Sequence, residues 1–229
     1  MSEIFTDLGI IRIGVALSML VIGSIIDIWK REIHDYYWIG FASLGIIITL
    51  FEENMLESFV LMGYALIIAP FSLLIWRLGL FGGADAFALI VLAVIAPVST
   101  FSENAITPFT VLSNAAILFV IPLLANLVRN IISLANKQDI FEGFEESLWT
   151  KIGAMIIGYR AKNPKFGFPI ERIEGKIKKI SLGFHHAENQ EFCNKSDTWI
   201  TPGIPYLLLI SGGYLIQLVY GDVLISWFM

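Results

Sequence analysis

Residues Leu8–Ile28 read LGIIRIGVALSMLVIGSIIDI, an apolar run in which Arg12 and Asp27 are the only charged residues. A helix that crosses a bilayer needs about 20 mostly apolar residues. The run is longer than the apolar region of a signal peptide. It is followed by Lys30 and Arg31 and not by a small-residue cleavage site. We therefore expect a permanent transmembrane helix here.

Five further apolar runs follow the first one. The chain is 56% hydrophobic and 15% charged, whereas soluble domains carry about 25% charged residues. Most charged residues lie between the runs, and no internal repeat is visible. We therefore expect an all-α membrane protein with six transmembrane helices, at Leu8–Ile28, Tyr36–Phe51, Ser58–Trp76, Ala84–Val98, Phe109–Val128 and Ile204–Tyr220.

A polar segment separates the fifth run from the sixth. We expect a five-helix region at residues 1–128, a cytoplasmic polar subdomain at 129–201, and the sixth helix with a short tail at 202–229. Within the subdomain, Glu145–Gly158 is typical of an amphipathic helix. Two interpretations of the subdomain stay open: a small solvated domain, or a membrane-surface platform that its basic residues attract to anionic lipid.

The distribution of Lys and Arg predicts the orientation, because cytoplasmic loops are enriched in these residues. Of the 15 Lys and Arg residues, all but Arg12 lie in the first, third and fifth connections. We expect these connections in the cytoplasm and both termini outside the cell membrane. Arg12 lies near the start of the first helix, where its side chain could extend to the opposite surface.

Two acidic residues lie in or at the edge of the predicted helices, near the same membrane face. Asp27 is in the last turn of the first helix, and Asp85 is in the first turn of the fourth. Acidic residues in membrane helices are rare and usually functional. If the two carboxylates meet, they retain one proton between them and can activate water while polarising a peptide carbonyl. Their positions alone fit two separate solvated acids equally well.

The residues before Asp85 are small. Because Gly82, Gly83 and Ala84 have small side chains, another backbone can approach them closely, and we expect an open, accessible segment beside the acid. The same residues would also suit a tight loop between two helices.

Metal and disulfide chemistry are not expected. The single cysteine, Cys193, excludes an internal disulfide and a zinc site built on a CxxC pair. His34 stands alone in a short loop, and His185 and His186 lack a further ligand cluster. We expect no metal, no cofactor and no nucleic-acid partner.

Three segments carry a family resemblance. In Asp27–Asp35, an Asp is followed six residues on by Ile-His-Asp, and Gly82–Asp85 reads Gly-Gly-Ala-Asp. These segments resemble the two signatures of the archaeal preflagellin and type IV prepilin peptidases, which are GxGD-type intramembrane aspartic proteases. His34 replaces a Pro of the first signature, and Ala84 replaces the second Gly of the other. Trp199–Pro205 is similar to the corresponding segment of the archaeal members.

The resemblance implies a metal-independent endopeptidase of the cell membrane, with Asp27 and Asp85 as its catalytic pair. Members cut the short basic leader from archaellin or pilin-like precursors on the cytoplasmic side, just before an apolar helix. Ala84 adds a methyl group beside the catalytic acid, which affects the width of the cleft. Bacterial members often add methyltransferase activity with a cysteine-rich loop; this chain lacks those cysteines, so we expect protease activity only.

Several residues near the expected cleft are candidates for substrate binding or support: Gly82, Gly83, Ala84, Glu32 and Asp35. The acids among them would attract a basic leader. Glu142, Glu145 and Glu146 offer the same charge, although such residues also keep a loop soluble. Membrane lipid and the precursor proteins are the expected partners.

Two other function classes stay open. Paired acids near one membrane face also fit a proton-coupled transporter or channel. A catalytically inactive scaffold, whose basic loop docks a partner, fits the charge distribution as well. Substrate flux without proteolysis would indicate the first, and a failure to cleave any precursor would indicate the second.

Overall fold

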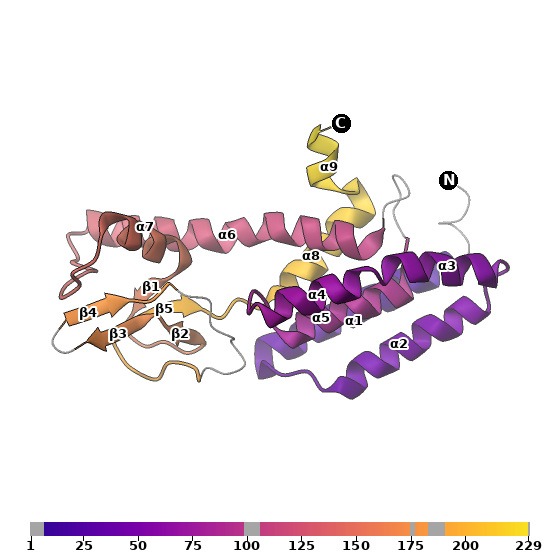
Figure 1. Ribbon diagram of the computed structural model, residues 1–229, viewed down its shortest axis with the longest axis horizontal. Helices are drawn as coiled ribbons and strands as arrows, with labels where there is room; N and C mark the ends of the chain where they lie inside the picture. Colours follow the sequence, from indigo (N-terminus) through magenta and orange to yellow (C-terminus); the bar gives the residue numbers. More distant parts are fainter. Residues whose placement is uncertain (1–6, 99–105, 175–176, 183–190, 229) are drawn as a thin grey trace. The chain divides into compact units, whose positions relative to one another are not determined.

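The computed structural model describes residues 7–98, 106–174, 177–182 and 191–228, and most of them are helical (Figure 1). The helices are α1 (Asp7–Lys30), α2 (Asp35–Leu50), α3 (Met55–Ala65), α4 (Ile68–Arg77), α5 (Gly83–Ile95), α6 (Thr107–Ala135), α7 (Leu148–Ile157), α8 (Tyr206–Tyr220) and α9 (Val223–Phe228). The chain divides into two compact units. Unit 1 comprises Met1–Leu118 and Pro205–Met229, and unit 2 comprises Phe119–Ile204.

Three described helical segments are long and apolar enough to cross a membrane: Leu8–Lys30, Met55–Arg77 and Thr107–Ala135. Helices α2, α5, α7 and α8 are apolar but shorter. The chain is therefore a membrane protein. The count of six spans, the side of each terminus and the predicted division at residues 128 and 201 remain predictions.

The third predicted run contains a break that we did not expect. Pro70 has no N–H to donate, and its ring clashes with the carbonyl of the residue four positions earlier, Leu66. The segment accordingly forms α3 and α4, separated by a turn at Leu66 and Ile67 in which Ile67 N–H donates to the Tyr64 carbonyl at 3.2 Å.

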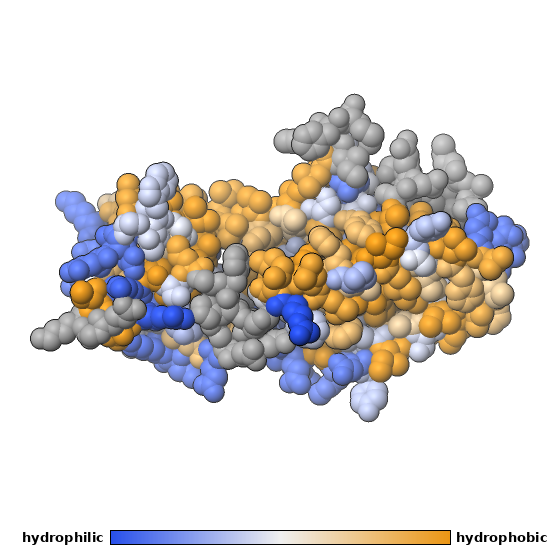
Figure 2. All heavy atoms as spheres, viewed as in Figure 1, coloured by the Kyte–Doolittle hydropathy of each residue, from blue (hydrophilic) through white to orange (hydrophobic). Residues whose placement is uncertain are grey.

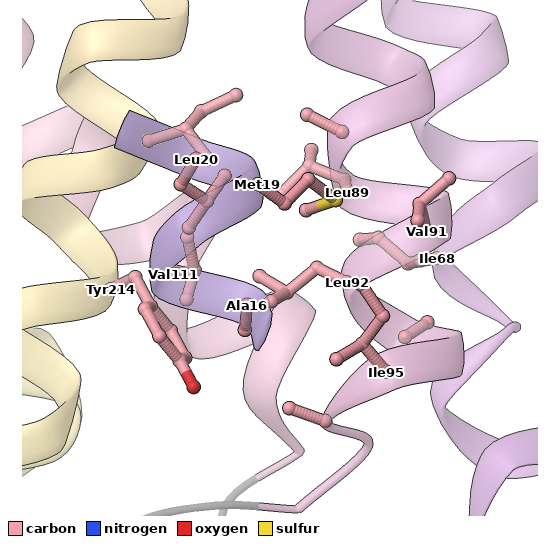
Figure 3. Close-up of a cluster of buried hydrophobic side chains, with 14 of the residues drawn as sticks. Ala16, Met19, Leu20, Ile68, Leu89, Val91, Leu92, Ile95, Val111 and Tyr214 are labelled. Carbon is pink, nitrogen blue, oxygen red and sulfur yellow. The ribbon is translucent and has the colours of Figure 1, made fainter. Parts of the chain in front are cut away.

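The core of unit 1 is built around α5, which packs against α2 and α4 and also touches α1 and α8. Leu89, Leu92 and Ile95 of α5 are fully buried, and Met19 and Leu20 of α1 pack in the same cluster (Figure 3). The apolar sequence of α5 is compatible with this central position, because a helix that is apolar on nearly every side is stable either among other helices or in lipid.

Small residues let the helices of unit 1 approach closely. A Cβ atom at Gly45 of α2 would lie 3.0 Å from the Cα of Ile95, and one at Gly213 of α8 would lie 2.6 Å from the carbonyl oxygen of Val111. Between α1 and α8, the hydroxyl groups of Ser24 and Ser211 are 2.7 Å apart and share a hydrogen bond. These contacts place the backbones of distant segments side by side.

Arg12 does not extend to the surface as its position had suggested. Its side chain is buried and donates hydrogen bonds to the Ile95 carbonyl at 2.6 Å, to Thr49 Oγ1 at 2.8 Å and to Glu52 Oε1 at 2.9 Å. Pairing with a carboxylate and polar groups makes the buried guanidinium tolerable. Arg12 thus ties α1 to the ends of α2 and α5.

Large apolar side chains also cover the outside of unit 1. Leu56 is 78% exposed, and Figure 2 shows apolar residues over much of the visible face of these helices. Soluble proteins rarely expose such continuous apolar surface. Contact with lipid explains it in a membrane protein.

Unit 2 corrects the expectation of an all-α fold. Its strands are β1 (Tyr159–Ala161), β2 (Gly167–Pro169), β3 (Glu171–Glu174), β4 (Ile177–Ile180) and β5 (Thr198–Pro202). These antiparallel strands form a three-stranded sheet in the order β1-β5-β2 and a two-stranded sheet of β3 and β4. The strands of four or five residues do not alternate apolar and polar residues strictly, and the others have only three residues, so the sequence pattern did not predict them.

The predicted amphipathic helix at Glu145–Gly158 is confirmed as the shorter α7. Ser147 caps it by accepting a hydrogen bond from Thr150 N–H at 3.2 Å. At the other end of α7, the side-chain amide of Asn130 in α6 donates hydrogen bonds to two backbone carbonyl oxygens. The distance from Asn130 Nδ2 is 2.9 Å to the Met155 oxygen and 2.7 Å to the Gly158 oxygen. These bonds satisfy orphan groups at the helix end.

Trp199 forms the centre of unit 2. It is fully buried, stacks on Phe141 at 4.8 Å between ring centroids, and donates a hydrogen bond from Nε1 to the Ile140 carbonyl at 2.8 Å.

At the surface of unit 2, the Arg160 guanidinium donates hydrogen bonds to both carboxylate oxygens of Asp197, at 2.7 and 2.8 Å. These hydrogen bonds lower the pKa of Asp197 from its ordinary value.

Candidate active site

Asp85 is held by the start of its own helix. It is the third residue of α5, and its Oδ2 accepts a hydrogen bond from Gly82 N–H at 2.9 Å. Its own N–H donates back to the Gly82 carbonyl at 3.2 Å. The first N–H groups of a helix lack partners within it, so a carboxylate here is favourable. The side chain is only 7% exposed.

Asp27 reaches the same place from another helix. It lies in the last turn of α1, is half-buried, and belongs to a helix that touches α5. Its carboxylate is close enough to that of Asp85 for the two charges to interact. Two acids distant in the sequence therefore lie on helices that touch each other, within range of an electrostatic interaction.

Two residues near the pair were not predicted. Arg31 lies one turn after Asp27 and interacts electrostatically with it. Arg31 adopts a positive φ of 59°, and its N–H donates to the Asp27 carbonyl at 3.0 Å, a common way to end a helix. Its spacing of four residues from Asp27 was a signal that could have found it.

Tyr206 is the second unpredicted neighbour. It is the first residue of α8, interacts electrostatically with Asp85, and stacks on Phe81 with ring centroids 5.6 Å apart. Nothing in the local sequence connects Tyr206 with Asp85, because the intervening chain includes all of unit 2.

The residues predicted to support the site lie around it in different ways. Gly82 directly precedes α5, and Gly83 and Ala84 are its first two residues. Glu32 is exposed in the connection between α1 and α2, and Asp35 is the exposed first residue of α2. Gly82 is in direct contact with the acid, because its N–H donates a hydrogen bond to Asp85 Oδ2.

The acids of the long connection belong to unit 2. Glu142 and Glu145 are exposed. Glu146 accepts a hydrogen bond from Ile180 N–H at 2.8 Å, so it holds β4 in place. This structural role accounts for Glu146 without a substrate.

No group of three or more His, Cys, Asp or Glu side chains in the described part of the chain could hold a metal ion. His185 and His186 lie outside the described residues. Cys193 is a buried free thiol.

Comparison with known proteins identifies the class. A model of the type IV leader peptidase family matches residues 14–125. A model of the archaeal peptidase A24 C-terminus, type II, matches residues 148–223. The first match includes Asp27 and Asp85, and the second includes most of unit 2 and α8. The chain belongs to the type IV leader peptidase family and is therefore a membrane protease.

Similar proteins include three archaeal preflagellin peptidases. That of Methanococcus voltae is 25% identical over 236 residues, covering 94% of this chain and 97% of the relative. That of Methanococcus maripaludis strain C6 is 27% identical over 241 residues, covering 91% and 94%. That of Methanocaldococcus jannaschii is 23% identical over 225 residues, covering 92% and 94%.

Proposed function

We propose that this protein is an aspartic endopeptidase that removes the short basic leader from archaellin or type IV pilin-like precursors at the cytoplasmic membrane face. The observation that carries the proposal is that Asp27 and Asp85 lie on α1 and α5, two helices that touch, and interact electrostatically across that contact. Membership of the leader peptidase family and similarity to preflagellin peptidases support the substrate class.

The first chemical step follows from two adjacent carboxyl groups that share one proton. The ionised carboxylate takes a proton from water, and the water oxygen attacks the carbonyl carbon of the scissile peptide. The protonated carboxyl group donates a hydrogen bond to the carbonyl oxygen, where negative charge develops. The pair acts as a unit, so neither role is assigned to one residue alone.

The second step breaks the peptide bond. The leaving nitrogen takes a proton from the pair, the carbon–nitrogen bond breaks, and the tetrahedral intermediate collapses to a carboxylic acid and an amine. The pair is left with one proton, as at the start. Within this proposal, the Gly82 N–H holds Asp85 in a fixed orientation, which limits the reorganisation needed in each cycle.

A cleavage assay tests the proposal. Membranes containing this protein are incubated with an archaellin precursor, a pilin-like adhesin precursor and a precursor with a charge-reversed leader. Loss of the leader from at least one of the first two, and not from the third, is expected. If none is cut while proton-coupled flux occurs in vesicles, the transporter alternative replaces the proposal.

A further inference from the structure

An apolar groove lies between α2 and α5 in unit 1 and is separate from the Asp pair. Its volume is about 330 Å³, within the range of ligand pockets. The lining residues are Asp35, Trp38, Ile39 and Ala42 from α2 and Phe87 and Val91 from α5. The four positions on α2 follow the spacing of one helix face. The groove is therefore an extended surface that runs along α2.

The groove is open to its surroundings. Ile39 is 58% exposed, and Phe87 is also exposed, whereas Trp38 and Val91 form the buried floor. Asp35, at the end of the groove, is the only charged residue that lines it. Its carboxylate has no hydrogen bond or ion pair with any residue that the structure describes.

The groove and the Asp pair lie at the same end of α5. Phe87 is only two residues beyond Asp85, about 3 Å along the helix axis and about 200° around it. A chain leaving the groove must therefore pass the start of α5 to reach the pair. Gly82 leaves room there, because a Cβ atom at this position would meet only Asp85 Oδ2, at 3.5 Å.

We propose that this groove binds the apolar helix of the peptide substrate, with a cationic side chain just before that helix paired with Asp35. This inference rests on the proposed function and adds a docking site and a specificity determinant to it. Charge favours a peptide over phospholipid as the occupant. The phosphate of a lipid headgroup would face the Asp35 carboxylate, and the groove lining offers no cation to bind it.

Crosslinking tests where the substrate lies. The photoreactive residue p-benzoylphenylalanine is placed at Ile39 in the full chain carrying Asp85→Asn, so that bound precursor is not cleaved. The expected adduct is with the apolar helix of a precursor that the wild-type protein cleaves. The same probe at Leu44, which is exposed on another face of α2, should give little adduct. Adducts with lipid alone, or equal yields at both positions, would overturn the proposal.

Filling the groove tests its contribution to binding. Ala42→Trp should raise KM for the full precursor about tenfold with little change in kcat, because docking remote from the chemistry contributes uniform binding. Cleavage of a peptide that lacks the apolar helix should not change. Leu44→Trp is the matched control for bulk on α2. A normal KM in a folded Ala42→Trp protein would contradict the groove.

A charge swap tests Asp35 without disturbing the fold, because the side chain is exposed. Asp35→Lys should raise KM about tenfold, since an attraction becomes a repulsion. A precursor in which the cationic residue before the helix is replaced by Glu should restore much of the loss. If the wild-type protein cleaves precursors but neither charge swap changes KM, the groove proposal is wrong and the proposed function is unaffected. If the wild-type protein cleaves none, the proposed function fails.

Discussion

The guanidinium of Arg12 donates a hydrogen bond to the carbonyl oxygen of Ile95 at 2.6 Å, at the end of α5 opposite to Asp85. The same side chain bonds Thr49 and Glu52 near the end of α2. One residue of α1 therefore fixes the depth of α1 against the helix that carries Asp85. Because Asp27 is also on α1, this contact helps to set the position of Asp27 along the axis of the helix that carries Asp85.

Removing Arg12 should destabilise the protein. Arg12→Ala leaves the buried Ile95 carbonyl and Thr49 without their donor and the partly exposed Glu52 without its ion pair. Loss of a hydrogen bond that involves a charged group typically costs about 1.5–3 kcal/mol. Arg12→Lys should recover only part of the loss, because one ammonium group cannot serve three divergent acceptors. Thermal unfolding in detergent measures both. Arg77→Ala is the control at an exposed helix end, and equal melting temperatures for Arg12→Ala and this control would contradict the role of Arg12.

Close packing of α8 on α6 predicts intolerance of any side chain at Gly213. Its Cβ would lie 2.6 Å from the Val111 carbonyl oxygen and 2.9 Å from the Ala115 nitrogen, both backbone atoms that move only with their helix. Gly213→Ala should cost about 1–3 kcal/mol of unfolding free energy. Gly40→Ala, where nothing lies within 4 Å, should be neutral or slightly stabilising. A melting temperature unchanged by Gly213→Ala would show that the helices are less tightly packed.

Six spans with both termini outside can be tested by cysteine labelling in a Cys193→Ser background. A membrane-impermeant maleimide should label a cysteine placed after residue 229, and Glu53→Cys in the second connection, in intact cells. Lys165→Cys, in the polar subdomain, should react only after permeabilisation. The reason is the concentration of basic residues in the odd connections. Labelling of residue 165 in intact cells would exclude this topology.

Chelators should leave cleavage intact, because the proposed chemistry uses carboxyl groups and water alone. The measurement is the initial rate of leader removal with and without EDTA, after extended incubation. A zinc protease treated in the same way is the control for chelation. Loss of activity with EDTA and recovery with zinc would exclude the aspartic mechanism.

The helical part of the fold was predictable because long apolar runs leave few alternatives in a membrane. The first run, Leu8–Ile28, corresponds to α1 at Asp7–Lys30, and the fourth, Ala84–Val98, to α5 at Gly83–Ile95. The break before Pro70 was also readable from the sequence and was missed. The strands of unit 2 were not predictable, because segments as short as Tyr159–Ala161 acquire their form from pairing with a distant strand.

Some residues of the candidate site were likewise predictable from the sequence, and others were not. Asp27 and Asp85 stood out because acids are rare in apolar helices. The partners of Arg12 were hidden, since Thr49 and Ile95 come from other helices and only packing brings them to α1. Tyr206 was hidden for the same reason. Asp35 was a candidate because of its charge and its position near Asp27. The groove that it lines could not be predicted, because it forms only where α2 packs against α5.

We propose that Asp27 and Asp85 form one catalytic unit, and the decisive measurement is single-turnover cleavage by their Asn variants. Asn has nearly the size of Asp but cannot accept or share the carboxyl proton. Asp27→Asn and Asp85→Asn should each remove essentially all cleavage, and the double variant should be hardly slower than either, because residues acting as a unit are not additive. Glu53→Gln, at an exposed position, should keep the wild-type rate. A folded Asp27→Asn or Asp85→Asn protein that cleaves precursor at nearly the wild-type rate would contradict an aspartic mechanism at this pair.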